Sequence, residues 1–169
     1  ASDTRVTHPD AICWACTSGS FLGSADSLNH QVDALAQAAG VPATTTSVAI
    51  LHALRRRGLQ RVCVLTPYVA EVGEPFIDYL GRHGVQVLSH AHAGQSTDEE
   101  IGALDADDFE PLVAQVWNAE AQAIVIPCTA VRVGAIVERL GEVYGVPIIL
   151  ANPATIEHAV ELARAKDDQ

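Results

Sequence analysis

Hydrophobic positions along the chain predict short apolar strands that alternate with amphipathic helices. Strand-like runs, each bounded by Gly, Pro or small polar residues, occur at 10–15, 41–46, 61–66, 85–91, 123–127 and 147–151. Apolar residues at helical spacing fill most of the intervals, at 24–39, 47–57, 67–82, 107–117, 131–143 and 152–166. Strands that alternate with helices of this length predict an α/β fold with parallel sheets.

One unit of the pattern occurs twice. Ala11-Ile12 leads to Cys16-Thr17, and Ala123-Ile124 leads to Cys128-Thr129 at the same spacing. Each is followed by a helix-like stretch, Gly-Val-Pro and a second helix-like stretch. An internal repeat of this kind predicts two pseudo-symmetric lobes. Ligands of such folds lie beyond the carboxyl ends of strands, so we expect the two Cys-Thr ends to face each other across a cleft.

The repeat also predicts how the chain divides. We expect a first lobe over 1–93, with the second lobe starting at about 48–61. An irregular acidic loop is expected over 94–108. The remainder of the second lobe and a closing helix should occupy 109–169.

Charge and composition narrow the class of protein. The net charge is −11 with ten Lys and Arg in 169 residues, which argues against a nucleic-acid partner and an anionic membrane surface. No apolar run is long enough for a transmembrane helix, and the polar N-terminus has no signal-peptide pattern. We therefore expect a cytoplasmic protein with no membrane partner.

The cysteines offer a redox or metal site as an alternative. Cys13 and Cys16 form a C-x-x-C pair, but zinc would need a second such pair, and a thioredoxin-like dithiol would open a helix rather than lie in an apolar run. In strands, Cys13 and Cys63 are more typical of small buried hydrophobic residues. His90 and His92 could form a metal site with His83, yet no carboxylate or cysteine has a matching spacing. We expect no metal.

Two thiols at opposed strand ends suggest chemistry on a flat carbon centre. A thiolate at the start of a helix is stabilised by backbone N–H groups, and the same groups can hold a carboxylate. Cys16 and Cys128 could then deprotonate and reprotonate a substrate from opposite faces, or one could add to it while the other delivers a proton. The alternative is that both are merely small buried cysteines.

Four motifs make the chain resemble the maleate cis-trans isomerase family, within the aspartate/glutamate racemase superfamily. The resemblance runs in order through nearly the whole chain. Its motifs are Cys16-Thr17-Ser18-Gly19-Ser20-Phe21, Pro42-Ala43-Thr44-Thr45-Thr46-Ser47, Leu65-Thr66-Pro67-Tyr68 with Glu71-Val72, and Cys128-Thr129-Ala130-Val131-Arg132.

The resemblance implies two Rossmann-like lobes, a homodimer and chemistry that needs no cofactor. It implies that Cys16 adds to the double bond of maleate, that the bond rotates, and that Cys128 acts as the proton partner before elimination gives fumarate. Tyr68 would hydrogen-bond the small dicarboxylate substrate. The remaining residues implied to bind its carboxylates are Thr17, Ser18, Thr129, Ala130 and Arg132.

The sequence departs from the family pattern in three places, one of which is that Pro127 and Ala130 flank Cys128 where we expect more polar residues. Asp98 stands where we expect a substrate-binding asparagine, and its charge would repel a dicarboxylate. Family members also begin earlier, with a strand and loop before residue 1. A racemase or decarboxylase-like relative acting on another small carboxylate or a hydantoin therefore remains open. So do a binding lobe and a thiol-redox protein that uses Cys13 and Cys16.

Overall fold

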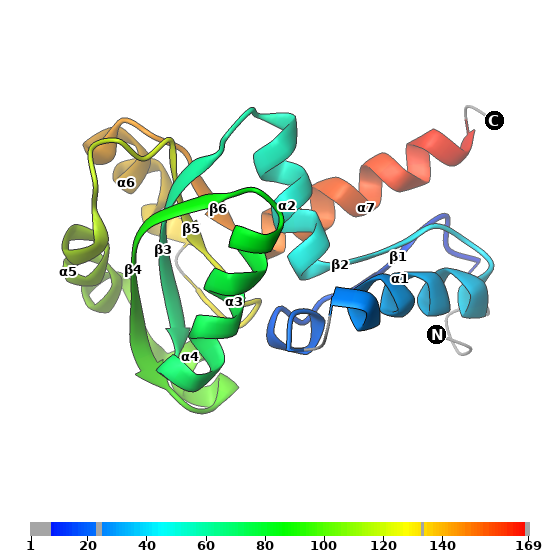
Figure 1. Ribbon diagram of the computed structural model, residues 1–169, viewed down its shortest axis with the longest axis horizontal. Coiled ribbons are helices and arrows are strands. Elements are labelled where there is room, and N and C mark those ends of the chain that lie inside the picture. The colour runs from blue at the N-terminus through cyan, green and yellow to red at the C-terminus, as the bar shows by residue number, and fades with distance from the viewer. Residues whose placement is uncertain (1–7, 23–24, 133, 168–169) are drawn as a thin grey trace.

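The computed structural model describes residues 8–22, 25–132 and 134–167, whose strands form two parallel sheets (Figure 1). β1 (Ile12–Trp14) pairs with β2 (Ala43–Thr45). The larger sheet has the order β4-β3-β5-β6. Its strands are β3 (Arg61–Tyr68), β4 (Gln86–Gln95), β5 (Ala123–Ile126) and β6 (Ile148–Leu150). The predicted α/β class with parallel sheets is confirmed.

Helices connect and cover these strands. Two 3₁₀ turns, η2 (Ser18–Ser20) and η3 (Gly134–Ile136), follow the two cysteine strands. The α-helices are α1 (Ala25–Ala39), α2 (Thr46–Arg56), α3 (Ala70–Arg82), α4 (Asp98–Ala103), α5 (Ala106–Val116), α6 (Val137–Tyr144) and α7 (Ala151–Asp167). None of the helices among the described residues is long and apolar enough to cross a membrane.

The internal repeat is present in three dimensions. The order β1, η2, α1, β2, α2 returns as β5, η3, α6, β6, α7. Ile12 N–H donates to Pro42 C=O at 3.0 Å, and Ile124 N–H donates to Pro147 C=O at 3.1 Å, at the same place in each unit. The last helices of the two units, α2 and α7, lie side by side (Figure 1). The repeated sequence pattern therefore encodes a repeated local fold.

The core is divided by the four-stranded sheet. Successive side chains of a strand point to opposite faces. Val62 and Val64 of β3 accordingly join the core beneath α2 and α3, whereas Cys63 and Leu65 join the core beneath α5 and α6. All four side chains are fully buried. This two-sided burial explains why the run 61–66 is continuously apolar rather than alternating.

Along the chain, the change from the smaller to the larger sheet comes before residue 93. β3 and most of β4 lie within the range expected for the first lobe, yet they pair with each other and, through β3, with β5. The change of sheet falls between Thr45 and Arg61, which includes the expected start of the second lobe at about 48–61. Only β1 and β2 form the smaller sheet, so the two complete lobes and their cleft stay a prediction.

The segment expected as an acidic loop is largely helical. α4 occupies Asp98–Ala103 and α5 begins at Ala106. Thr97 and Asp105 each form a capping box with the acidic residue three positions later, Glu100 and Asp108. The acidic residues of this segment do not form an irregular loop, because they help to satisfy the first N–H groups of two helices.

Other helix starts also differ from expectation. α2 begins at Thr46 rather than at 47 and is capped by Thr45, while the Ser47 hydroxyl binds the Thr17 carbonyl. α5 begins at Ala106 rather than at 107 and is capped by Asp105. The expected helix over 131–143 begins as the turn η3, and residue 24, where the first helix was expected to start, lies outside the described residues.

Candidate active site

The two Cys-Thr turns interlock. Thr17 Oγ1 accepts a hydrogen bond from the Cys128 N–H at 3.1 Å, and Thr129 Oγ1 donates to the Ala15 carbonyl at 3.2 Å. Each threonine of the repeat therefore binds the backbone of the other turn. Residues more than a hundred positions apart are joined at the carboxyl ends of β1 and β5, as the repeat predicts for these two ends.

A buried serine pair fixes the first turn. Ser20 Oγ and Ser47 Oγ both contact the Thr17 carbonyl, at 2.8 and 3.3 Å, and lie 2.7 Å from each other. All three residues are buried. The pair joins the motif that begins at Cys16 to the motif that ends at Ser47. It thereby holds Thr17 in place to receive the Cys128 N–H.

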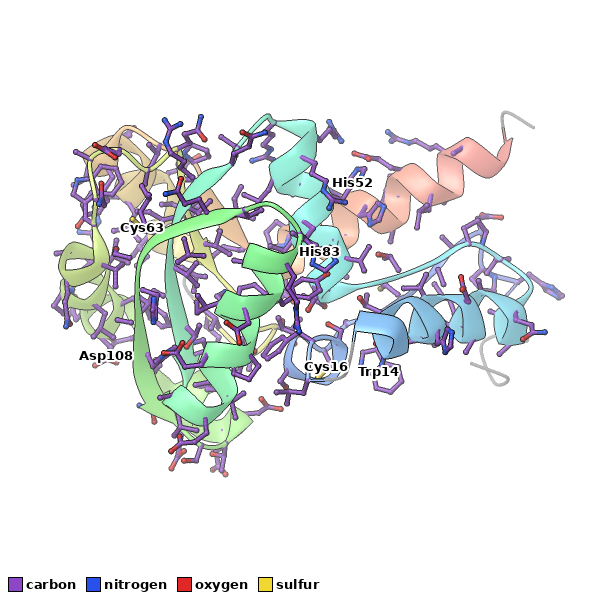
Figure 2. The ribbon with its side chains drawn as sticks, viewed as in Figure 1. Trp14, Cys16, His52, Cys63, His83 and Asp108 are labelled. Carbon is purple, nitrogen blue, oxygen red and sulfur yellow. The ribbon has the colours of Figure 1, made fainter. Side chains whose placement is uncertain are left out.

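Cys16 is partly exposed, and Ser18, Gly19 and Trp14 are its neighbours in the turn. Its Sγ is 3.8 Å from Ser18 Oγ. A methyl group added at Gly19 would lie 3.2 Å from Cys16 Sγ and 3.3 Å from Trp14 Nε1. The Cys16 thiol and the Trp14 indole N–H therefore both lie close to Gly19, and a larger residue at this position would crowd them. Figure 2 shows Cys16 and Trp14 close together beside α1, far from Cys63.

Cys128 differs from Cys16 in its burial and in its backbone conformation. It is buried, and its backbone φ of 100° is in the left-handed region that residues with a side chain rarely adopt. The Ala130 N–H donates to its Sγ at 3.4 Å. Burial raises the pKa of the Cys128 thiol, and the nearby Asp98 charge raises it further, while the neighbouring Tyr68 hydroxyl and the Ala130 N–H act in the opposite direction.

Tyr68 stands at the carboxyl end of β3, between the turns. Burial raises the pKa of its phenol well above the usual value, and the negative charges of Cys128 and Cys16 act in the same direction. The hydroxyl lies near Cys128 and Thr17 but forms no hydrogen bond of normal geometry with any described residue. Tyr68 therefore brings a buried hydroxyl that lacks such a partner among the described residues close to Cys128 and Thr17.

The other predicted site residues differ in whether a charge or a contact relates them to the two Cys-Thr turns. Asp98 is the first residue of α4, and its charge acts on the Cys128 thiol. The same helix approaches the second turn, since a methyl group added at Gly102 would lie 3.8 Å from the Ala130 carbonyl. Arg132 is exposed and makes no ion pair with a residue that the structure describes. Within the part of the chain that the structure describes, no ion pair ties the Arg132 guanidinium to the site.

Comparison with known proteins identifies the family. The family model described as arylmalonate decarboxylase matches residues 1–169. The chain belongs to the arylmalonate decarboxylase family. Arylmalonate decarboxylase from Bordetella bronchiseptica is 26% identical over 132 residues, 77% of this chain and 55% of that protein. Maleate isomerase from Nocardia farcinica is 22% identical over 152 residues, 86% of this chain and 61% of that protein. The chain thus spans little more than half of these relatives.

Solved structures of the family share the fold. A crystal structure of arylmalonate decarboxylase matches with a TM-score of 0.87 at 24% identity, covering 96% of this chain and 72% of that one. A cysteine-to-serine mutant of Nocardia farcinica maleate cis-trans isomerase with a covalently bound succinylcysteine intermediate matches with a TM-score of 0.88 at 20% identity. It covers 95% of this chain and 69% of that one. The resemblance to the maleate isomerase and racemase-like family is confirmed, with part of the two-lobe fold present.

Sequence reasoning misplaced one cysteine and missed several neighbours of the site. Cys13 is exposed, not buried, because β1 belongs to a sheet of only two strands. The roles of Trp14, Ser20 and Ser47 were missed, although each serine lies in a motif shared with the family. The position of the two serines in these shared motifs could have identified them from the sequence.

Proposed function

We propose that this chain carries the catalytic residues of a cofactor-independent isomerase that converts maleate to fumarate. The observation that best supports this is the pair of hydrogen bonds that join the two Cys-Thr turns, from the Cys128 N–H to Thr17 Oγ1 at 3.1 Å and from Thr129 Oγ1 to the Ala15 carbonyl at 3.2 Å. The two thiols are therefore carried by turns that touch each other. In the proposal, a flat substrate binds between the turns with one sulfur on each face.

Cys16 is the nucleophile in this proposal because it is the more accessible of the two thiols. Its thiolate adds to one alkene carbon of maleate, so that an S–C bond forms and the electron pair moves to the other carbon. The carbon–carbon bond becomes single and can rotate. Formation of a succinylcysteine intermediate in the Nocardia farcinica relative is consistent with such an addition.

Cys128 is the proton donor. Its raised pKa keeps the thiol protonated near neutral pH, and the thiolate left after proton transfer would be stabilised by the Ala130 N–H and the Tyr68 hydroxyl. After rotation, this thiolate removes a proton from the same carbon and Cys16 leaves, giving fumarate. In this cycle the two cysteines and the substrate supply every proton and electron pair, so the reaction needs no cofactor.

Carboxylate binding is assigned to the two turns. Backbone N–H groups around Thr17, Ser18, Thr129 and Ala130 would hold the carboxylates of a small dicarboxylate. Arg132 would balance their charge from the exposed side. The negative charge of Asp98, which acts on the Cys128 thiol, opposes this binding. The homodimer implied by the family resemblance remains a prediction.

A second candidate is decarboxylation of an arylmalonate. It is favoured by the identity of 26% to the Bordetella bronchiseptica decarboxylase. In that reaction carbon dioxide leaves, and the carbanion that remains takes a proton from Cys128, so Cys16 would not need to act as a nucleophile. The two reactions therefore differ in their need for Cys16. A racemase of another small carboxylate would need both thiols.

Proton NMR of maleate and phenylmalonate, each incubated with the protein, separates these candidates. We expect wild type to produce fumarate, and Cys16→Ala and Cys128→Ala each to lose at least about a thousandfold in rate. Cys13→Ser is the matched control and should keep full activity, which a thiol-redox function would not allow. Phenylacetate formation that survives Cys16→Ala would favour the decarboxylase. Turnover of neither compound would contradict both proposals for this chain.

A further inference from the structure

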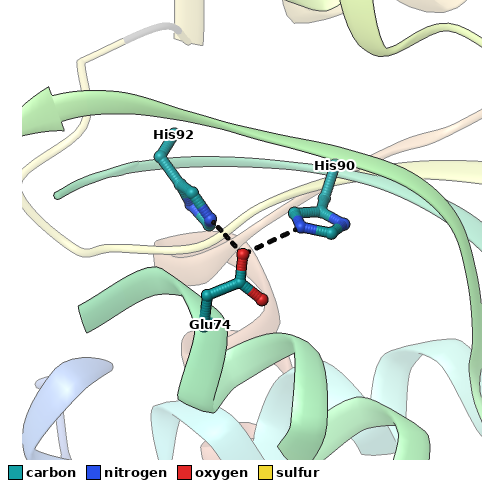
Figure 3. Close-up of side chains that lie close together, drawn as sticks. All are labelled: Glu74, His90 and His92. Carbon is teal, nitrogen blue, oxygen red and sulfur yellow. Dashed lines mark hydrogen bonds and ion pairs between the residues drawn. The ribbon is translucent and has the colours of Figure 1, made fainter. Parts of the chain in front are cut away.

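A second group of ionisable side chains lies on the outer strand of the large sheet, apart from the thiols. Glu74 of α3 faces His90 and His92 of β4 (Figure 3). One carboxylate oxygen, Glu74 Oε1, is 3.1 Å from the Nε2 atom of each histidine. The three atoms all lie within 4.8 Å of one another. A carboxylate and two imidazole nitrogens thus converge on one point.

Local structure explains the convergence. Residues two apart in a strand point to the same face, so His90 and His92 both face α3. A methyl group added at Gly73 would lie 2.2 Å from His92 Nδ1, so only glycine lets this ring lie against the helix. The sequence prediction found no carboxylate at a matching spacing because Glu74 comes from a different element. His83 instead binds the Tyr79 carbonyl at 2.8 Å and does not join the group.

The second nitrogen of His92 is already engaged. His92 Nδ1 lies 2.7 Å from Thr66 Oγ1, a fully buried hydroxyl on β3. When Nδ1–H donates to this hydroxyl, the lone pair of Nε2 points toward Glu74. An outer hydrogen bond of this kind is what orients metal-bound histidines in proteins.

We propose that Glu74, His90 and His92 bind a divalent transition-metal ion of the zinc type. Two imidazoles and one carboxylate suit zinc and its neighbours, whereas calcium and magnesium prefer oxygen ligands alone. Tetrahedral ligands at zinc distances lie about 3.3 Å apart, close to the separations between Glu74 Oε1 and the histidine nitrogens. Three protein ligands leave a fourth position for water. The ion would join α3 to β4, and its outer partner Thr66 is two residues from Tyr68.

Zinc titration tests this proposal. We expect wild-type protein to compete with a chromophoric chelator for one zinc ion per chain. His90→Ala, which removes a ligand at the rim of the group, should weaken that binding by at least about tenfold. His30→Ala is the matched control, because it removes an exposed histidine from α1. Thermal melts in EDTA show that each variant is folded, and zinc should raise the melting temperature of wild type and His30→Ala only.

Cobalt distinguishes this group from the cysteines as the place of binding. Bound Co²⁺ should give visible absorption without the strong near-ultraviolet band of thiolate ligation. Thr66→Val keeps the shape of the outer partner but removes its hydroxyl, and should weaken binding by about ten- to a hundredfold. Absence of saturable binding to wild type would overturn the proposal. Equal binding to wild type and His90→Ala, or a thiolate band, would overturn it too.

Discussion

The two Cys-Thr turns share sequence and topology but not environment. Cys16 is partly exposed and follows a strand of the two-stranded sheet. Cys128 is 6% exposed, follows a central strand of the four-stranded sheet, and has a left-handed backbone with φ of 100°. A raised pKa is found for the second thiol, through burial and the Asp98 charge. A duplicated motif has therefore produced two chemically different cysteines.

The difference has a structural origin. Tyr68 of β3 and Asp98 of α4 belong to segments between the two repeat units, and both act on Cys128. These inserted segments complete the environment of the second turn. Duplication can thus supply two thiols, while the unrepeated part of the chain assigns the roles of nucleophile and proton donor proposed for them.

The largest expected effect is an all-or-none difference in covalent adduct formation. Cys128→Ser should retain the Cys16 nucleophile but lose the matched proton partner, so elimination slows and a maleate adduct accumulates on Cys16. Cys16→Ser should form none. Intact-mass measurement after incubation with maleate detects the added mass, and peptide mapping locates it.

Maleate can also modify an exposed thiol without catalysis. Cys13→Ser in the Cys128→Ser background controls for this, because Cys13 is the exposed cysteine of β1. The adduct should remain in this double variant. An adduct that maps to Cys128 in Cys16→Ser would reverse the proposed roles.

The second expected effect concerns the two threonines that join the turns. Thr17→Val leaves the Cys128 N–H without its acceptor in a buried place, which should cost about 1–3 kcal/mol of unfolding free energy. Thr129→Val removes a donor from a more exposed carbonyl that water can reach, so about 0.5–1.5 kcal/mol is expected. Urea unfolding of both variants gives the comparison. Equal losses would show that the turns are energetically symmetric.

Much of this arrangement could be predicted from the sequence. The repeat of Cys-Thr and Gly-Val-Pro was enough to predict the duplicated topology. The continuous apolar run 61–66 was enough to predict a strand that is buried on both faces. Family motifs drew attention to Tyr68, which does lie beside Cys128. These features depend on local pattern and on strand ends, which a sequence displays directly.

The remaining features depend on contacts between distant elements. The burial of Cys128 and the exposure of Cys13 follow from how many strands flank each one, which no periodicity reveals. Glu74 meets His90 and His92 only because α3 packs on β4. Acidic residues at 98–108 were equally consistent with a loop, since a capping box and a solvated connector share the same composition.

The smallest expected effect isolates the contribution of Asp98 to the difference between the thiols. Its negative charge raises the pKa of Cys128, so Asp98→Asn should lower that pKa and increase the thiolate fraction at a given pH. Iodoacetamide should then modify Cys128 faster, by less than about tenfold, because an exposed carboxylate acts partly through solvent. Glu99→Gln removes the neighbouring charge of α4 and serves as the control. Alkylation of Cys128 followed by peptide mass spectrometry across a pH series should shift toward lower pH in Asp98→Asn alone, while burial keeps Cys128 slower than Cys16. An unchanged profile would mean that burial alone distinguishes the two cysteines.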